Sequence, residues 1–281
     1  MKKLILRIVR FILLRLIGKR NIQEAILFIS HLAFIDLLTL GYQSRGILKY
    51  ENIFVSGEKF VISRILKDYL KSKNPVLFDV GANLGDYSRE LRTEFPHSHI
   101  YAFEPNLYTF KTACENLDSL NINCFNLGFG YQEAEASIYT YSDEKYSEHA
   151  SLYKDVLLNF HKANNLVEMQ FLMTTLDKFC QKENINFIDF IKIDVEGHEL
   201  EVLKGAERMI ADKKISIIQF EFNVCNIISR VFLKDFYELL KGYDIYRIDS
   251  DRLIPLFEYD FANEIFKFQN FLAISQHISK L

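Results

Sequence analysis

The stretch Asn74–Ser88, NPVLFDVGANLGDYS, decides the fold because it joins an apolar segment to a helix-like pattern through two glycines. The run Val76–Val80 is apolar except for Asp79, and Gly81 follows it directly. A glycine in such a turn adopts positive φ easily and lets a ligand approach bare backbone. The stretch therefore predicts a buried strand, a ligand-binding turn at Gly81 and Gly85, and a helix.

The same alternation of strand and helix patterns continues along the chain. Apolar strands separated by helices are typical of a parallel sheet that is covered on both faces. We therefore predict a doubly wound α/β fold with a mostly parallel, seven-stranded sheet, whose last two strands form an antiparallel edge. The other six expected strands are HIYAFEP (99–105), INCFNLG (122–128), FIDFIKIDVEG (187–197), ISIIQFEF (215–222), YDIYRID (243–249) and FLAISQ (271–276).

Two segments differ from this alternation. Residues 1–68 read as a helical, basic extension that precedes the α/β domain of residues 69–281. Residues 130–186 form an unusually long connection, in which ASIYTYS and VEMQFLM alternate like the strands of a β-ribbon. Long connections in compact domains are usually functional lids or binding loops, so we expect substrate choice to reside there.

The charge is distributed unevenly. Residues 1–20 contain seven basic side chains and no acid, which leaves 27 basic against 37 acidic residues in the remainder. An acidic body argues against nucleic acid as a partner. The basic segment is typical of a helix on an anionic membrane surface, or of a helix packed on its own domain, and both interpretations stay open. The apolar run Ala25–Ile35 suits a core helix better than a membrane span.

The cysteine pattern and the membrane interpretation together indicate a location. The four cysteines show no pairing or zinc-ligand spacing, so we expect reduced thiols in a cytoplasmic protein. If residues 1–20 bind lipid, the protein lies peripherally at the inner face of the membrane.

The residues around the glycine turn indicate the class of cofactor. Glu104 ends the second strand, 23 residues after Gly81, where a carboxylate can accept both hydroxyls of a ribose. Asn83 stands where the dinucleotide fingerprint requires a second glycine, and Asp79 and Asp86 flank the turn without a lysine or arginine inside it. An acid-flanked turn disfavours a diphosphate and favours a positively charged cofactor such as S-adenosylmethionine.

A second motif, IKIDVEGHE (191–199), brings candidate catalytic groups to a neighbouring strand end. Side chains alternate along a strand, so Lys192, Asp194 and Glu196 should share one face. Transfer of a group to an acceptor hydroxyl needs a residue that takes the proton. Asp194, Glu196 and His198 are the candidates, although His198 also fits an exposed position in the first turn of a helix.

Two further possibilities stay open at this site. Oxygen-rich clusters hold Mg²⁺, so Asp194 with Glu196 or Glu221 is a candidate metal site, although a site without metal is the favoured interpretation. His149, within the long connection, is a weaker candidate base, and a solvated loop histidine explains it equally simply.

Four motifs occur in an order that resembles a known family. FDVGANLGDYS (78–88), YAFEPN (101–106), TTLDKF (174–179) and IKIDVEGHELEVLKGA (191–206) together resemble the FkbM family of S-adenosylmethionine-dependent methyltransferases. The resemblance covers roughly residues 76–223. It implies a class I, Rossmann-like methyltransferase fold and O-methylation of a sugar, glycan or glycolipid precursor, as in polysaccharide biosynthesis.

The resemblance also assigns cofactor contacts by position. Asp79, Gly81 and Gly85 would line the methionine end, with Asn83 in the same turn. Glu104 would bind the ribose, and Asn126 or its neighbour would lie near the adenine. A nicotinamide-dependent oxidoreductase and a non-catalytic, membrane-associated scaffold of the same fold remain the alternatives.

Overall fold

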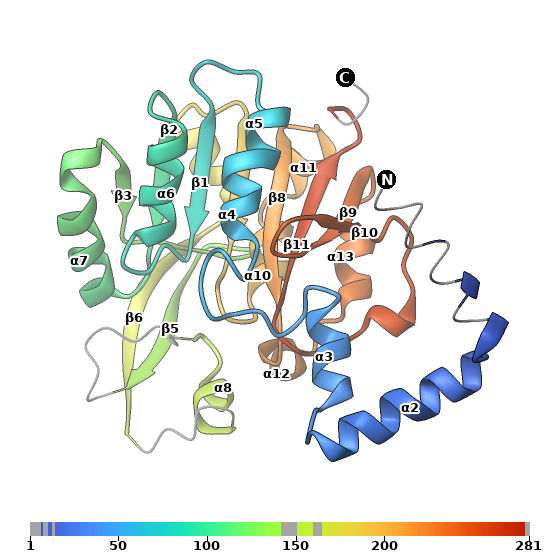
Figure 1. The fold of residues 1–281 in the computed structure, drawn as a ribbon. Helices are drawn as coiled ribbons and strands as arrows, with labels where there is room; N and C mark the ends of the chain where they lie inside the picture. Colours follow the sequence, from blue (N-terminus) through green and yellow to red (C-terminus); the bar gives the residue numbers. More distant parts are fainter. Residues whose placement is uncertain (1–6, 8–10, 13–14, 142–150, 160–164, 279–281) are drawn as a thin grey trace. The chain divides into compact units, whose positions relative to one another are not determined.

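The apolar run at 76–80 forms the central strand of an eight-stranded sheet, whose order is β10-β9-β11-β8-β7-β1-β2-β3 (Figure 1). Strands β1, β2, β3, β7 and β8 are parallel, whereas β11 runs antiparallel to both β8 and β9. The strands are β1 (Val76–Val80), β2 (His99–Phe103), β3 (Asn123–Phe125), β7 (Ile188–Ile193), β8 (Ile215–Phe222), β9 (Tyr243–Ile248), β10 (Leu253–Pro255) and β11 (Gln269–Ser275).

This computed structural model describes residues 7, 11–12, 15–141, 151–159 and 165–278. His149, the weaker candidate base, lies outside the described residues. The chain divides into two compact units, residues 1–44 and 45–281. The segment 45–68, which the sequence pattern grouped with the extension, belongs to the larger unit because Val61 and Leu66 are buried against its sheet.

The doubly wound α/β fold is confirmed, with one strand more than the seven expected. The additional strand, β10, has three residues and pairs antiparallel with β9 at the sheet edge. It is too short to show an alternating pattern, and it ends in Pro255, which cannot donate to a further strand. The antiparallel pairing of the last two expected strands, β9 and β11, is also confirmed.

Helices cover both faces of the sheet because successive strand residues point to opposite sides. From β1, Leu77 points to one buried cluster, and Phe78 and Val80 point to the other. The first face is covered by η1 (Val61–Ile65), α5 (Leu66–Tyr69) and α6 (Asp86–Glu94). The second is covered by α9 (Leu176–Lys182), α10 (Glu199–Lys204), α11 (Glu207–Ala211) and α13 (Leu233–Leu239). The remaining helices that the structure describes in the larger unit, apart from α8, are α4 (Glu58–Phe60), α7 (Leu107–Leu117), η2 (Asp118–Leu120), α12 (Cys225–Ser229) and η3 (Phe261–Asn263).

A second, three-stranded sheet in the order β4-β6-β5 begins just before the long connection, which supplies its other two strands. Its strands are β4 (Gly128–Phe129), β5 (Ala134–Tyr141) and β6 (Leu166–Thr174). Strands β5 and β6 pair antiparallel along their lengths, so the two alternating stretches of the sequence lie against each other. The short helix α8 (Lys154–Asn159) lies in sequence between these two strands.

Among its described residues, the smaller unit contains α2 (Lys19–Leu32) and α3 (Leu37–Gln43), whose axes differ in direction by 108°. Asp36 caps α3 by accepting hydrogen bonds from the backbone of Leu38 (2.9 Å) and the hydroxyl of Thr39 (2.7 Å). Among the described helices none is long and apolar enough to cross a membrane by itself, although this bent pair passes that test by length and composition.

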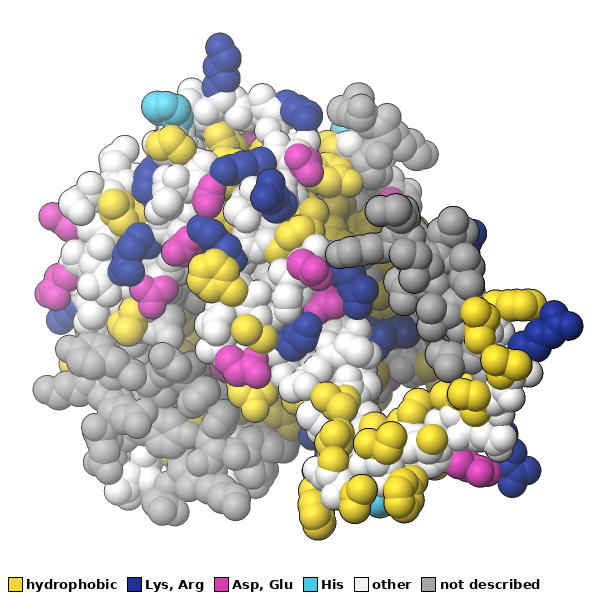
Figure 2. Space-filling view, in the orientation of Figure 1, with side chains coloured by type: hydrophobic (Ala, Val, Ile, Leu, Met, Phe, Trp, Pro, Cys, Tyr) yellow, Lys and Arg dark blue, Asp and Glu magenta, His cyan; other side chains and the backbone are white. Residues whose placement is uncertain are grey.

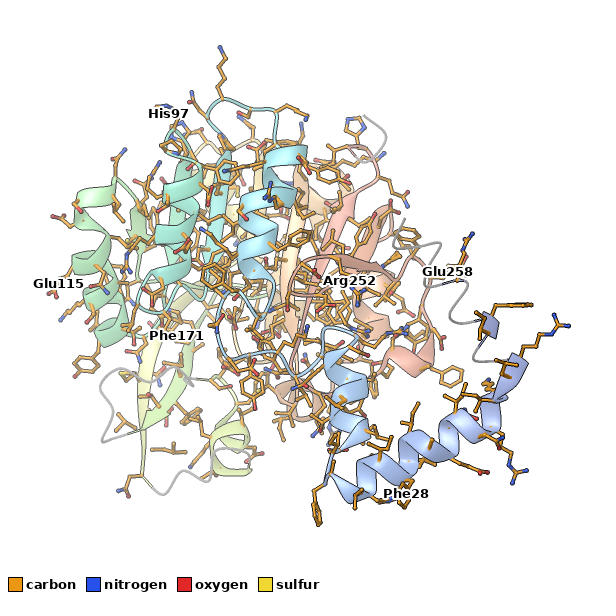
Figure 3. All side chains as sticks on the ribbon, viewed as in Figure 1. Phe28, His97, Glu115, Phe171, Arg252 and Glu258 are labelled. Atoms are coloured by element: carbon orange, nitrogen blue, oxygen red, sulfur yellow. The ribbon has the colours of Figure 1, made fainter. Side chains whose placement is uncertain are left out.

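The expectation of a core helix at Ala25–Ile35 is wrong. Helix α2 buries only Ser30, and large apolar side chains stay exposed along both helices (Figure 2). Phe28, for example, extends outward from α2 (Figure 3). Composition alone misled here, because core helices and surface-binding helices contain the same apolar residues.

We expect Gly81→Ala to destabilise the protein by about 4 kcal/mol, because this substitution combines backbone strain with a clash. Gly81 has φ +81°, and an added Cβ would lie 1.8 Å from the backbone oxygen of Asp194. Gly242 is the matched control, since it has φ +92° with nothing within 4 Å of its Cβ position. Gly242→Ala should therefore cost only the backbone strain, about 1–2 kcal/mol. Urea denaturation of both variants measures the difference, and equal losses would contradict the clash.

Candidate active site

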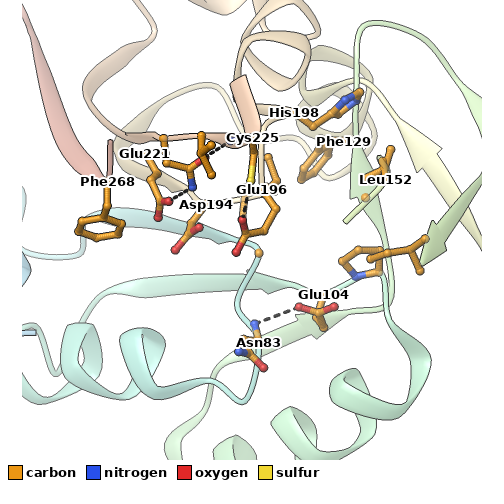
Figure 4. A pocket seen from close by; sticks show the side chains of 18 of the residues that line it. Asn83, Glu104, Phe129, Leu152, Asp194, Glu196, His198, Glu221, Cys225 and Phe268 are labelled. Carbon is orange, nitrogen blue, oxygen red and sulfur yellow. Dashed lines mark hydrogen bonds between the residues drawn. The ribbon is translucent and has the colours of Figure 1, made fainter. Parts of the chain in front are cut away.

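A pocket of about 690 Å³ lies at the carboxyl ends of β1, β2, β7 and β8, where ligands bind in open parallel sheets (Figure 4). Because β11 runs antiparallel to β8, the residues that precede β11 reach the same end of the sheet. The polar and glycine lining comprises Gly81 and Asn83 after β1, Glu104 after β2, Gly128 in β4, Asp194, Glu196 and His198 after β7, Glu221 in β8, Asn223 after β8, and Lys267 before β11.

The turn after β1 is held in place by backbone hydrogen bonds to β2 and by packing against a neighbouring helix. The backbone amides of Gly81 and Ala82 donate to the carbonyl of Phe103, at 3.0 and 2.9 Å. The missing Cβ of Gly85 makes room for the side chain of Leu117, which would lie 2.7 Å away. Packing between protein segments thus explains both glycines, and of the two only Gly81 also lines the pocket.

Glu104 is held at the rim of this turn by two backbone amides. Its carboxylate oxygens accept from Asn106 N (2.8 Å) and Asn83 N (3.0 Å). Burial raises the pKa of Glu104 to about 7, although these two hydrogen bonds favour the ionised form. Each carboxylate oxygen accepts one of these bonds and has two lone pairs, so Glu104 can accept further donors from a ligand.

Two other residues assigned to the cofactor lie outside the pocket lining. Asp79 is fully buried on the side of the sheet that faces α6, where Ser88 donates to it at 2.7 Å and burial raises its pKa. The amide of Asn126 donates to the carbonyls of Glu104 and Pro105, both at 2.9 Å. Asn126 therefore fixes the chain after β2, and its neighbour Leu127 lines the pocket.

Three carboxylates from β7 and β8 gather on one side of the pocket, with Glu104 on the other in this view (Figure 4). We call Asp194, Glu196 and Glu221 the acidic group. Glu196 accepts from the thiol of Cys225 at 3.3 Å, and Glu221 accepts from the amide of Asn223. Burial, together with the charges of Asp194 and Glu196, raises the pKa of Glu221 well above its usual value.

A buried lysine lies beneath the acidic group. Lys192 donates to Asp194 at 2.9 Å, and its ammonium lies 4.9 Å from the centre of the Tyr87 ring. Burial alone would lower the pKa of Lys192, but Asp194, Asp79 and Glu58 together raise it above its usual value. Lys192 is therefore a permanent cation, and it balances part of the acidic charge.

His198 is buried, unlike the exposed first-turn residue that was the alternative interpretation. Its Nδ1 lies 3.2 Å from the hydroxyl of Tyr153, and its Nε2 is buried without a hydrogen-bond partner among the described residues. Burial lowers the pKa of His198, so the ring is neutral near pH 7. A neutral imidazole that lines the pocket has a lone pair able to take a proton, so His198 stays a candidate base, and its contact with Tyr153 also lets it position that hydroxyl.

Glu199 holds the end of β7 and was missed in the sequence. One of its oxygens accepts from the backbone amides of Val195 and Gly197, both at 3.1 Å, and burial raises its pKa to about 8. A glutamate two residues after a strand-end glycine and at the start of a helix pattern was the available signal.

Aromatic residues complete the lining next to the acidic group. Tyr50 and Phe268 meet edge to face with their ring centres 5.9 Å apart, and both line the pocket. No local signal could have identified them, because they lie 218 positions apart in the sequence, far from any motif. Leu127, Pro105 and Phe129 give the side near Glu104 an apolar wall.

The magnesium hypothesis gains no support. Among the residues that the structure describes, no three or more His, Cys, Asp or Glu side chains form a group that could hold a metal ion. Asp194, Glu196 and Glu221 together therefore do not form such a group.

The sheet order and the pocket define a Rossmann-like α/β protein with its binding site at the carboxyl edge. The chain belongs to the methyltransferase FkbM domain family, whose sequence model matches residues 79–243. This span includes Glu104 and the acidic group.

Individual relatives are distant. The hexuronic acid methyltransferase AglP of Haloferax volcanii is 27% identical over 168 residues, covering 60% of this chain and 64% of the relative. The chain thus spans somewhat less than two thirds of that protein. The 2-O-methyltransferase NoeI of Sinorhizobium fredii is 20% identical over 169 residues, covering 57% of this chain and 68% of the relative. A crystal structure of a methyltransferase FkbM from Methylobacillus flagellatus has a TM-score of 0.43 at 15% identity, covering 73% of this chain and 45% of that one.

The pKa of Glu104 predicts a specific dependence of stability on pH. A carboxyl group whose pKa rises on folding favours the folded state below its ordinary pKa, and this contribution is lost as pH rises through the folded value, about 7. Between pH 4 and 8, we expect the native protein to lose about 3 kcal/mol of unfolding free energy relative to Glu104→Gln.

Urea denaturation at several pH values measures this difference. Glu115→Gln is the matched control, because Glu115 extends from the exposed side of α7 (Figure 3). Its stability should follow that of the native protein at every pH. Parallel curves for Glu104→Gln and the native protein would contradict the raised pKa.

Proposed function

We propose that this protein is an S-adenosylmethionine-dependent O-methyltransferase that methylates a hydroxyl of a sugar, glycan or glycolipid precursor. One observation carries the proposal beyond family membership. The pocket has a buried carboxylate with free acceptor capacity, Glu104, beside the β1 turn, and a separate acidic group at the ends of β7 and β8. We therefore assign the part of the pocket around Glu104, the cofactor half, to the cofactor, and the part around the acidic group, the acceptor half, to the acceptor.

The residues present fit the proposed cofactor. Glu104 can accept the two hydroxyls of a ribose, and the side-chain oxygen of Asn83 is buried without a hydrogen-bond partner among the described residues. Lys267 is the one lysine or arginine in the described lining, so the pocket favours a positively charged cofactor over a diphosphate. Leu127 and Phe129 offer an apolar wall for an adenine ring.

Bound S-adenosylmethionine would supply a methyl group activated by a positively charged sulfur. The contribution of this chain is to orient the acceptor hydroxyl and to take its proton. Asp194 suits the second role, because it lines the pocket and its Oδ2 is held in place by the ammonium of Lys192. Glu221 also lines the pocket, and its raised pKa favours the protonated form, which can donate a hydrogen bond to the acceptor.

The residues of the acceptor half suit the binding of a substrate with several hydroxyl groups. Carboxylates accept hydrogen bonds from hydroxyls, and the rings of Tyr50 and Phe268 offer apolar surface for a sugar face. The relative AglP is named a hexuronic acid methyltransferase, and NoeI is named a 2-O-methyltransferase. Ile138, Leu152 and Phe171 reach the pocket from the long connection, which supports our proposal that this segment selects the substrate.

Titration calorimetry tests the cofactor. We expect saturable binding of S-adenosylmethionine, no binding of NADH, and at least about a hundredfold weaker binding of S-adenosylmethionine by Glu104→Ala, because two hydrogen bonds to a charged group are lost. Glu115→Ala removes the same group from an exposed site and should bind normally. Binding of NADH instead would replace the proposal with an oxidoreductase.

Turnover tests the role of Asp194. Asp194→Asn keeps an oxygen for Lys192 but cannot take a proton, so we expect unchanged cofactor affinity and a turnover lowered about 10²- to 10⁴-fold. Asp86→Asn is the matched control, since Asp86 flanks the turn with its side chain exposed to solvent. Transfer of a labelled methyl group to neutral sugars and uronic acids gives the rates. Full activity of Asp194→Asn would reject this assignment.

A further inference from the structure

The smaller unit exposes an apolar surface that continues through a sharp bend. We define the apolar corner as Ile26, Ile29, Leu32, Phe34, Ile35 and Leu38. The most exposed members are Phe34 at 96%, Leu32 at 71% and Leu38 at 63%. Exposed apolar surface of this kind is unfavourable in water and marks a site of interaction.

The apolar side chains follow one side of α2. Ile22, Ile26 and Ile29 recur at the spacing of one helix face. The opposite side carries polar residues that include Gln23 and His31. Helix α2 is therefore amphipathic, and its apolar face carries large exposed side chains.

Charge and shape decide which partner fits this surface. The adjoining residues 1–20 contain seven basic side chains and no acid, which suits an anionic partner. The corner bends by 108° between α2 and α3, so a protein groove would have to follow the same bend. A membrane interface is a plane and accepts both helices at once.

The length of α2 and the charged cap of α3 limit how deeply the apolar corner can enter a bilayer. Helix α2 has 14 residues and is therefore about 21 Å long, shorter than the hydrocarbon core of about 30 Å. The carboxylate of Asp36 adjoins the apolar tip, and each of its oxygens accepts one hydrogen bond, from the backbone amide of Leu38 or the hydroxyl of Thr39. A charged cap is compatible with the headgroup boundary and costly in the bilayer centre.

We propose that residues 19–43 dock on an anionic lipid bilayer, with the apolar corner inserted at the boundary between headgroups and acyl chains and without crossing the membrane. Amphipathic helices with basic flanks bind in this way, through apolar burial and attraction to anionic lipids. The inserted surface is the corner itself, whereas the basic residues before it supply attraction alone.

Co-sedimentation of the full chain with phosphatidylcholine vesicles, with and without phosphatidylglycerol, tests the proposal. We expect binding to the phosphatidylglycerol vesicles that is weakened but retained at about 1 M salt, where the Debye length is about 3 Å. The variant Ile29→Glu/Leu32→Glu should partition at least about tenfold less, because it removes two inserted side chains.

The matched control is Gln23→Glu/His31→Glu, which adds two acids to the polar side of the same helix. It should lose far less binding than Ile29→Glu/Leu32→Glu. Thermal unfolding and S-adenosylmethionine titration report whether the larger unit remains folded in each variant.

Three outcomes would overturn the proposal. Equal losses in both double variants, with complete release at high salt, would mean that basic residues alone attach the chain. Absence of vesicle binding, with a dimer in light scattering that Ile29→Glu/Leu32→Glu dissociates, would assign the corner to a second copy. Absence of both would mean that the corner covers another part of its own chain.

Discussion

The buried ammonium of Lys192 holds together the polar residues beneath the pocket. Lys192 bonds to Asp194, contacts the Tyr87 ring, and lies in the field of Asp79 and Glu58. Tyr87 in turn donates to Gln219 of β8 at 3.0 Å, and Gln219 contacts Glu58 at 3.3 Å. A single desolvated charge thus links β7, β8, α6 and α4, and the acids around it could not share this interior without it.

The parts of the site that the sequence predicted are those encoded by neighbouring residues. The β1 turn and Glu104 are local features, since a glycine after an apolar run and an acid at the next strand end need no tertiary information. Tyr50 and Phe268 illustrate the opposite case, because they meet only after β11 has inserted beside β8. Likewise, Gly85 looked like a ligand contact, but its partner is Leu117 on another helix.

The apolar segment in the smaller unit shows a different limit of sequence analysis. Residues 25–35 have the composition of a core helix, and the distinction between core and surface depends on what packs against them. Ser30 is the one residue that α2 buries, so the packing expected of a core helix is absent from the described unit. Edge strand β10 was missed for a related reason, since three residues are too few to display a period.

The backbone contact between Gly81 and Asp194 has an evolutionary consequence. It joins the turn after β1 to the end of β7 so closely that a side chain cannot enter. By contrast, the segment between β4 and α9 contributes only the apolar side chains of Ile138, Leu152 and Phe171 to the described lining. Such an insertion can be exchanged or rebuilt between related proteins while the joined strand ends keep their shape. Replacing this segment would therefore change the apolar wall of the pocket and leave the contact between Gly81 and Asp194 intact.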